Sequence, residues 1–402
     1  MKSERVYNAC LLSAITRKKL EKNTNLKYSV ILSNSAKRGI IPQNVQFDKN
    51  IANEENIDRY YVVKVGDFIY NPRISTTAPC GPINQNDCCD GVVSPLYTVF
   101  SCKPECVYDK YLKFYFQTSL WHEYIRSVAN TGARHDRMNV SDKDFFSMLI
   151  KLPPIAEQRK IVEILSAQDR IIELKTKLLE EKKRLKKYLR QMLLSGKRRI
   201  PGHAEPWKRK RLSDIAQRLT VRNTEQCNNV LTISASDGLV SQEAYFKKEV
   251  AGKDKSNYFL LLRDDYAYNR SSSSCNPYGA IKRLKKYSTG IVSPLYICFR
   301  MNTNLVDVNY VEFAFDSGVL NKELDMVTQE GARNHGLLNI AVEDFFNCRI
   351  ELPSYDEQVK IAEILQALYY SVTLLEKELE QENLKKKALM QQLLTGKIRV
   401  KV

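Results

Sequence analysis

The side chains best suited to specific recognition are arginines, asparagines and histidines in polar loops, one set in each half of the chain. Arginine can bind the O6 and N7 edge of guanine and asparagine the N6 and N7 edge of adenine, while lysine neutralises phosphate. Such loops predict contact with duplex DNA. The candidates are Arg73, Thr76, Arg134, His135, Arg137 and Asn139 in the first half, and Asn269, Arg270, Lys282, Arg283, Arg333, Asn334, His335 and Asn339 in the second.

Plainer interpretations of these loops stay open. The Gly-Ala-Arg runs at 132–134 and 331–333 are equally typical of a structural turn whose arginine caps a helix. The basic cluster at 282–286 suits phosphate contact, and it is equally typical of an exposed, solvated turn.

The sequence carries no recognisable catalytic set. An adenine methyltransferase needs an Asn-Pro-Pro-aromatic run and a glycine-rich cofactor loop, whereas the segments 71–74 and 276–279 are better explained as turns. There is no Gly-x-x-x-x-Gly-Lys phosphate loop, and only four histidines are present. The ten cysteines form no Cys-x-x-Cys pair, so we expect free thiols rather than disulfides or a zinc site. We expect a non-catalytic protein with no metal or cofactor of its own.

The composition indicates a basic protein of two or three domains. The chain has 402 residues, 43% of them hydrophobic, and a formal net charge of +17. Such an excess of positive charge is typical of proteins that bind polyanions. No stretch is apolar enough to span a membrane, and no signal sequence follows Met1, so we expect a cytoplasmic location.

The sequence contains an internal repeat with a spacing of about 200 residues. The segment 152–161 returns as 352–361, with Glu-Gln at the same place in both copies. Shorter patches also match, including Gly-(Val/Ile)-Val-Ser-Pro-Leu-Tyr and Asp-Phe-Phe, whereas the segments 73–90 and 270–289 differ. A duplicated scaffold with two different surface loops suits a protein that reads two unlike half-sites.

Each copy of the repeat predicts one long helix. Pro154 suits a first helical position, Ser354 and Glu357 have the spacing of a capping box, and Gly196 and Gly396 suit helix ends. Each helix would be roughly 60 Å long. Apolar residues at steps of three and four predict a two-helix seam, interrupted by lysines in the first copy. The predicted seam residues are Ile161, Ile164, Ile171, Leu178, Leu185 and Leu189, with Ile361, Leu365, Leu368, Val372, Leu375, Leu379 and Leu389.

These patterns together resemble the specificity subunit of type I restriction–modification systems. The resemblance rests on Leu-Pro-(Pro/Ser)-x-x-Glu-Gln-x-x-Ile at the head of each helix, after an Asp-Phe-Phe patch, and it covers essentially the whole chain. It implies an α+β protein in which two mixed α/β target-recognition domains form a pseudo-two-fold repeat, separated by two long antiparallel helices as a coiled-coil spacer. The implied boundaries are 1–151 and 198–351 for the recognition domains, with 152–197 and 352–402 for the central and distal helices.

The resemblance also implies a mode of action. Each recognition domain would read one half of a split, asymmetric target in double-stranded DNA, and the helices would dock two methyltransferase subunits. Motor-nuclease subunits would complete the complex, and the partners would use S-adenosylmethionine, ATP and Mg²⁺. A helix of this length would place the half-sites between one and two DNA turns apart, at about 34–36 Å per turn. Shortening both helices by equal whole turns would then shorten the gap.

The first copy departs from the pattern at its start. The second copy opens with Pro206-Trp207, whereas the first opens with Arg5-Val6-Tyr7 and has no tryptophan there, which predicts a shortened or divergent first domain. Two other functions stay open. A coiled-coil scaffold would bind DNA weakly and without sequence preference, and a fused enzyme, against which the missing motifs argue, would transfer methyl groups alone.

Overall fold

The computed structural model describes residues 7–46, 54–130, 136–224, 227–234, 237–246, 255–273, 276–328 and 338–401. The chain forms two compact units, one of residues 1–176 and 377–402 and the other of residues 177–376. Each unit contains one globular α/β part and portions of both long helices, α6 (Ile155–Leu194) and α12 (Tyr355–Leu394). The mixed α+β class predicted from the sequence is confirmed.

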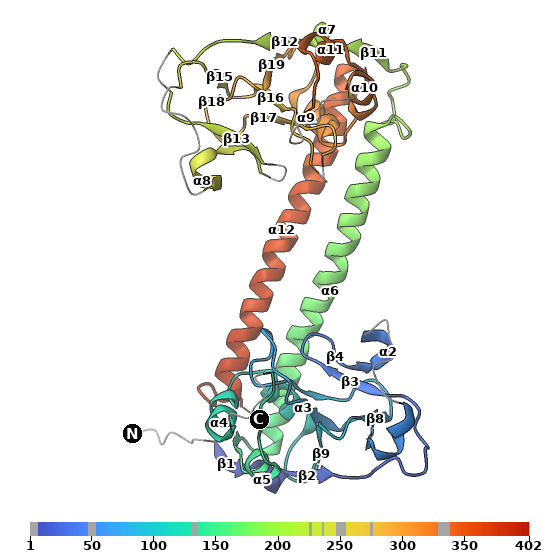
Figure 1. Cartoon of the computed structure of the whole chain (residues 1–402), viewed down its shortest axis with the longest axis vertical. Helices are drawn as coiled ribbons and strands as arrows, with labels where there is room; N and C mark the ends of the chain where they lie inside the picture. The colour runs from blue at the N-terminus through green and yellow to red at the C-terminus, as the bar shows by residue number, and fades with distance from the viewer. Residues whose placement is uncertain are drawn as a thin grey trace. The chain divides into compact units, whose positions relative to one another are not determined.

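The globular part of the first unit comes entirely from the chain before α6 (Figure 1). Its elements are β1 (Asn8–Leu11), α1 (Leu12–Ile15), β2 (Thr16–Lys19), β3 (Leu32–Ser35), β4 (Gly39–Pro42), α2 (Gln43–Gln46), the 3₁₀ helix η1 (Glu54–Arg59), β5 (Tyr61–Val63), β6 (Phe68–Tyr70), β7 (Ile83–Gln85), β8 (Gly91–Val93), β9 (Thr98–Cys102), α3 (Asp109–Phe116), α4 (His122–Val128), α5 (Asp142–Phe146) and β10 (Leu149–Leu152).

The second globular part lies between the two long helices in sequence and repeats the same plan. Its elements are β11 (Lys208–Arg211), α7 (Leu212–Ile215), β12 (Ala216–Leu219), β13 (Leu231–Ser234), β14 (Gly238–Ser241), α8 (Gln242–Phe246), β15 (Phe259–Leu262), β16 (Tyr266–Asn269), β17 (Ala280–Arg283), β18 (Thr289–Val292), β19 (Ile297–Met301), α9 (Val308–Asp316), α10 (Asn321–Val327), α11 (Val342–Asn347) and β20 (Arg349–Leu352).

The strands pair in the same order in both units. The four-stranded sheet β2-β9-β6-β7 corresponds to β12-β19-β16-β17, and the pairs β1-β10, β3-β4 and β5-β8 correspond to β11-β20, β13-β14 and β15-β18. The first and last strands close each globular part, with Asn8 opposite Leu152 and Lys208 opposite Leu352. These registers are shifted by the same 200 residues on both strands, which confirms the internal repeat.

Stacked aromatic rings hold the central strand of each sheet to the Asp-Phe-Phe patch. The ring centroids of Tyr70 and Phe145 are 4.9 Å apart, and those of Tyr268 and Phe345 are 4.8 Å apart. All four side chains are buried. The Asp-Phe-Phe patch therefore packs against the last part of β6 in the first unit and of β16 in the second. This contact fixes the position of each strand end.

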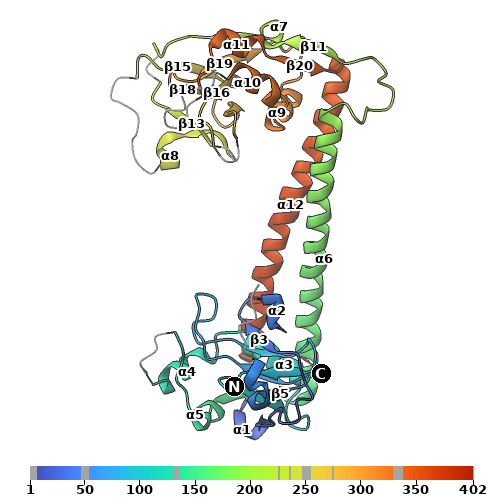
Figure 2. The same ribbon diagram turned by 45° about the vertical axis from the view of Figure 1, so that its right-hand side comes forward.

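The helices α6 and α12 run antiparallel and side by side (Figures 1 and 2). In the first unit, the amide of Gln168 donates to the carboxylate of Glu382 at 2.8 Å. The ammonium of Lys175 forms ion pairs of 3.1 Å with Glu378 and Glu382. Basic α6 therefore pairs with acidic α12 through polar contacts in the seam as well as apolar ones.

Buried and half-buried side chains recur on both helices at alternating steps of four and three, as in a coiled coil. On α12 they include every predicted seam residue, namely Ile361, Leu365, Leu368, Val372, Leu375, Leu379 and Leu389. On α6 they are Ile161, Leu165, Gln168, Ile172, Lys175, Leu179, Lys182, Lys186, Leu189 and Leu193.

The predicted seam of α6 is wrong in its middle part. Ile171, Leu178 and Leu185 are 39%, 48% and 41% exposed. Ile164 packs against the core of the globular part. The apolar periodicity is misleading here because polar side chains, Lys175 among them, occupy seam positions opposite the acidic residues of α12.

The glutamate at the head of each helix binds an arginine that follows the end of the other helix. Glu157 is buried and accepts hydrogen bonds from Arg399, 2.8 Å from Nε and 2.5 Å from Nη2. Glu357 accepts two bonds of 2.8 Å from Arg199 in the same way. Glu357 is therefore used in an ion pair rather than in the capping box predicted with Ser354.

The glutamine beside each glutamate fastens the helix to its globular part. The side-chain carbonyl of Gln158 accepts a 2.8 Å hydrogen bond from the backbone N–H of Tyr108 at the start of α3. Gln358 accepts a 3.0 Å bond from Asp307 at the start of α9. The repeated Glu-Gln motif therefore joins three segments in each unit.

Tyr7 occupies in the first unit the place that Trp207 occupies in the second. The guanidinium of Arg399 lies 4.8 Å from the ring centre of Tyr7, and that of Arg199 lies 5.8 Å from the ring centre of Trp207. The hydroxyl of Tyr7 also donates to the carbonyl of Leu393 at 2.9 Å. Of the two predictions for the first domain, shortened or divergent, the second describes this anchor: a different aromatic residue forms it, while each sheet of the second unit has its counterpart in the first.

Within the described ranges, no helix has the length and apolar character needed to cross a bilayer. The cysteines in this part of the chain are free thiols. No group of three or more histidine, cysteine or acidic side chains is placed to bind a metal ion among these same residues.

Candidate nucleic-acid interface

The loop between β6 and β7, residues 71–82, carries Arg73. A hydrogen bond from Tyr70 and a close backbone approach at Gly81 fix its conformation. The buried hydroxyl of Tyr70 donates to the carbonyl of Cys80 at 3.0 Å. Gly81 has a φ of +78°, and a Cβ there would lie 2.1 Å from a carbonyl oxygen on the other side of the loop. Only glycine fits this position. The loop is therefore a fixed platform for the side chains that it presents.

Two predicted candidates from distant parts of the sequence meet at this loop. Arg73 lies opposite Arg137 in an antiparallel bridge, and the Nε of Arg73 is 3.7 Å from the carboxylate of Asp136. The candidates Thr76 and Asn139 are exposed. The first unit thus gathers Arg73, Thr76, Arg137 and Asn139 on neighbouring segments at one end of β6.

The corresponding loop of the second unit, residues 270–279, uses its polar side chains differently. The side-chain oxygen of Asn269 accepts a 3.1 Å hydrogen bond from the backbone N–H of Ser271. The guanidinium of Arg270 donates to the carbonyls of Ile340 and Leu295 at 3.0 and 3.1 Å. Asn269 therefore holds the loop backbone, and Arg270 joins the start of the loop to the backbone at Ile340 and Leu295. Ser271 is exposed beside them.

Lys282 and Arg283 on β17 face α9. The ammonium of Lys282 is 2.8 Å from Asp316. Arg283 is only 7% exposed and pairs with Glu312 at 2.7 Å. Neither the predicted phosphate contact nor the alternative of a solvated turn describes Arg283, because its charge is neutralised in the interior.

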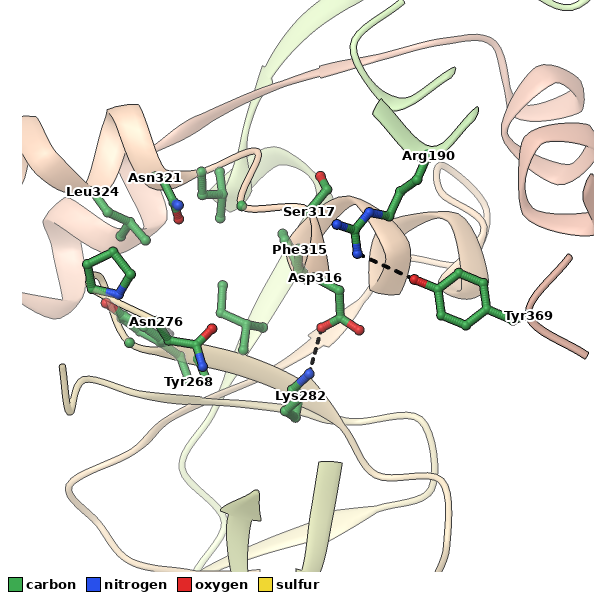
Figure 3. Close-up of a pocket in the computed structure, with 16 residues that line it drawn as sticks. Arg190, Tyr268, Asn276, Lys282, Phe315, Asp316, Ser317, Asn321, Leu324 and Tyr369 are labelled. Carbon is green, nitrogen blue, oxygen red and sulfur yellow. Dashed lines mark hydrogen bonds and ion pairs between the residues drawn. The ribbon is translucent and has the colours of Figure 1, made fainter. Parts of the chain in front are cut away.

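A pocket of about 300 Å³ lies beside β17 in the second unit (Figure 3). Lys282 and Asp316 meet on one side of it, and Arg190 of α6 donates to the hydroxyl of Tyr369 of α12 at 3.4 Å on another. The two contacts are separate pairs in the pocket lining. Lys282 and Asp316 neutralise each other, whereas Arg190 has only a neutral hydroxyl as its partner here.

The remaining candidates are placed as follows. Arg134 and His135 in the first half, and Arg333, Asn334 and His335 in the second, lie outside the described residues and stay predictions. Asn339 is described and exposed, directly after the segment that contains the last three.

Sequence reasoning missed two polar residues beside the first loop. Asn34 on β3 donates to the carbonyls of Ile69 and Pro82 at 2.7 and 3.0 Å, so the β3–β4 hairpin is tied to both ends of the loop. Asp136 lies next to Arg73. Asn34 is 3% exposed, and a buried, fully bonded amide has no signature in a single sequence. Asp136 was detectable as an acid within the arginine-rich segment.

Comparisons with known proteins agree on one family. Residues 13–184 match the family model of the type I restriction modification DNA specificity domain. The chain is 27% identical over 335 residues to the type I restriction enzyme MjaVIII specificity subunit of Methanocaldococcus jannaschii, covering 77% of this chain and 75% of that protein. The fold resembles that of the HsdS subunit from Thermoanaerobacter tengcongensis, with a TM-score of 0.56 and 16% identity over 98% of both chains. It also resembles a chain from a structure of complex assembly and conformational transition in the type I R-M system, with a TM-score of 0.53 and 16% identity over 98% of this chain and 99% of that one.

The duplicated α/β unit joined to two long antiparallel helices is therefore a fold that this chain shares with the HsdS subunit. Residues 13–184 thus match the DNA specificity domain of type I restriction–modification systems, and most of the chain is similar to a specificity subunit of such a system.

Proposed function

We propose that this chain directs a type I restriction–modification complex to a split DNA target. The globular part of each unit reads one half-site, and the two halves differ in sequence. The helix pair sets the length of the gap between them and docks two methyltransferase subunits, with motor-nuclease subunits completing the complex. The chain itself contributes position only, while its partners use S-adenosylmethionine, ATP and Mg²⁺ and flip the target adenine out of the duplex.

The observation that carries the proposal is that the two units share one scaffold but present different loop residues on it. The two units share strand order and the stacked tyrosine–phenylalanine contact. At equivalent places on these frames, the first unit presents Arg73 opposite Arg137, and the second presents Ser271 beside an arginine that is bonded to backbone carbonyls. Equal frames with unlike surface residues are suited to two unlike half-sites.

Exposed apolar side chains on the helices support the docking role. On α6 they follow one another at steps of three, four and seven residues, as on one face of a helix. They are Ile171, Leu174, Leu178, Leu185 and Tyr188, and α12 adds Ile364, Tyr370, Leu374 and Leu384. Three of these, Ile171, Leu178 and Leu185, were predicted as seam residues, and their exposure makes them available to another subunit.

Whether DNA methylation depends on the presence of this chain tests the proposed function. Long-read methylation mapping compares cells that express the neighbouring methyltransferase subunit with and without this chain. We expect a split motif with methyladenine in each half that appears only when the chain is present. If the chain binds the methyltransferase but adds no motif, and its DNA affinity is sequence-blind and wholly salt-sensitive, the scaffold function replaces the proposed one.

A further inference from the structure

We propose that Arg73 and Arg137 act together to read guanine in the half-site bound by the first unit. The proposal rests on the function proposed above and names the residues and the base for one of its two sites.

The backbone places the two arginines side by side. The N–H of Ile74 donates to the carbonyl of Asp136 at 3.0 Å, and the N–H of Met138 donates to the carbonyl of Pro72 at 2.8 Å. These bonds flank the bridge between Arg73 and Arg137, which is therefore a non-hydrogen-bonded antiparallel pair. In such pairs the two side chains leave the same face of the ribbon, with their Cβ atoms about 4.5–5.5 Å apart.

Two like charges in this geometry repel each other unless an acceptor lies between or beyond them. Asp136 is 3.7 Å from the Nε of Arg73, but the two side chains are 66% and 52% exposed, so the pair contributes little. Among the residues that the structure describes, no hydrogen bond or ion pair engages the guanidinium of Arg137, and no hydrogen bond engages that of Arg73. The pair is therefore suited to an acceptor supplied from outside.

The chemistry of the neighbouring residues favours a base over a phosphate. A short two-stranded ribbon fits the major groove, where arginine binds the O6 and N7 atoms of guanine with two hydrogen bonds. The carboxylate of Asp136 would repel a phosphate, whereas it can accept a hydrogen bond from the N4 amino group of cytosine in the same G·C pair. Lysine, a point charge suited to phosphate, is absent from the segments 71–82 and 136–139.

The second unit does not repeat this arrangement. The backbone N–H of Arg73 donates to the side chain of Asn71 at 3.0 Å, and that of Ser271 donates to Asn269 at 3.1 Å, so Ser271 stands at the position of Arg73. Among the described residues, this arginine pair is therefore a feature of the first unit alone.

Methylation mapping of variants tests the pair. The variants are Arg73→Ala, Arg137→Ala and the charge-preserving Arg73→Lys and Arg137→Lys. We expect each to relax discrimination at one G·C position of the first half-site by about 5- to 150-fold, the loss of one bidentate contact, and to leave the second half-site unchanged. The matched control is Arg17→Ala in the same unit, an arginine that is 70% exposed and 3.8 Å from Glu105, which we expect to leave the motif unaltered.

Two results would overturn the guanine assignment while leaving the proposed function intact. One is a uniform loss of methylation at an unchanged motif, which marks a phosphate contact. The other is full retention of the motif in both alanine variants, because alanine has no donor with which to bind the O6 and N7 atoms of guanine. A wild-type chain that directs no motif at all would overturn the proposed function together with the pair. Thermal unfolding of each variant separates misfolding from lost recognition. We expect the lysine variants to have melting temperatures closest to that of the wild type.

Discussion

At the scale of single residues, the ion pairs at the helix ends are the contacts that the structure makes most specific. Hydrogen bonds from Arg399 lower the pKa of the Glu157 carboxyl, and burial opposes that effect. For Glu357, burial raises the pKa, but the bonds from Arg199 and from the N–H of Ile200 outweigh it, so the pKa is also lowered. A carboxylate with a lowered folded-state pKa stabilises the fold above its unfolded pKa, and that stability is lost as the pH falls through the folded pKa.

In the pair of Arg399 and Glu157, we expect removal of the arginine to lower the free energy of unfolding more than removal of the glutamate. Arg399→Met leaves the buried Glu157 carboxylate without its cation, which we expect to cost about 2 kcal/mol at pH 7. Glu157→Gln leaves an arginine that is 36% exposed and can be solvated, so it should cost less. Thermal unfolding at pH 7 and pH 5 measures both effects.

The loss of stability in Arg399→Met should depend on pH. In Arg399→Met the carboxylate of Glu157 has lost its cation and can take up a proton at lower pH. The melting temperature of the variant should therefore lie closer to that of the wild type at pH 5 than at pH 7. Lys160→Met, which breaks a surface ion pair with Glu163 on the same helix, is the control and should change little at either pH. Equal deficits for Arg399→Met and Lys160→Met would contradict the buried-pair interpretation.

At the scale of elements, the sequence predicted the helices better than their contact. The lengths of α6 and α12 and the glycines at their ends were predictable, and Gly196 and Gly396 do have positive φ. The seam of α12 was predictable because its seam positions are largely apolar. The seam of α6 was not, since Gln168 and Lys175 occupy it and their partners are on a helix 200 residues away in sequence.

The corrected seam is tested by two adjacent leucines of α6. Leu179 is 8% exposed and Leu178 is 48% exposed. We expect Leu179→Ala to destabilise the protein by about 2–3 kcal/mol, as for a buried leucine, and Leu178→Ala to change stability by less than about 0.5 kcal/mol. Denaturant titration compares the two, and a larger loss for Leu178→Ala would restore the seam first predicted from the sequence.

The loops show where prediction from sequence stops. The turn at Gly66-Asp67 and the strand β6 that follows it have the glycine and the apolar residues that predict such structures from sequence. The meeting of Arg73 with Arg137 was not, because it depends on a bridge between segments more than sixty residues apart. The burial of Arg283 was missed for a similar reason, as its partner Glu312 lies on a helix beyond two further strands.

At the scale of the whole molecule, each globular part is closed by a strand pair with the same register. Residues 8–152 and 208–352 therefore begin and end at equivalent points. The Glu-Gln motif that binds each part to its helix follows directly after both segments. The two segments are thus interchangeable in their attachments, although their loops differ.

The most direct measurement of half-site reading is methylation mapping of a chain in which residues 208–352 are replaced by a second copy of residues 8–152. The reverse replacement serves as its matched partner, and copurification with the methyltransferase subunit shows that each hybrid assembles. If each globular part reads one half-site, the first hybrid methylates a target with two copies of the first half-site, and the reverse hybrid a target with two copies of the second. An assembled hybrid that keeps the original asymmetric motif would contradict the assignment of one half-site to each unit.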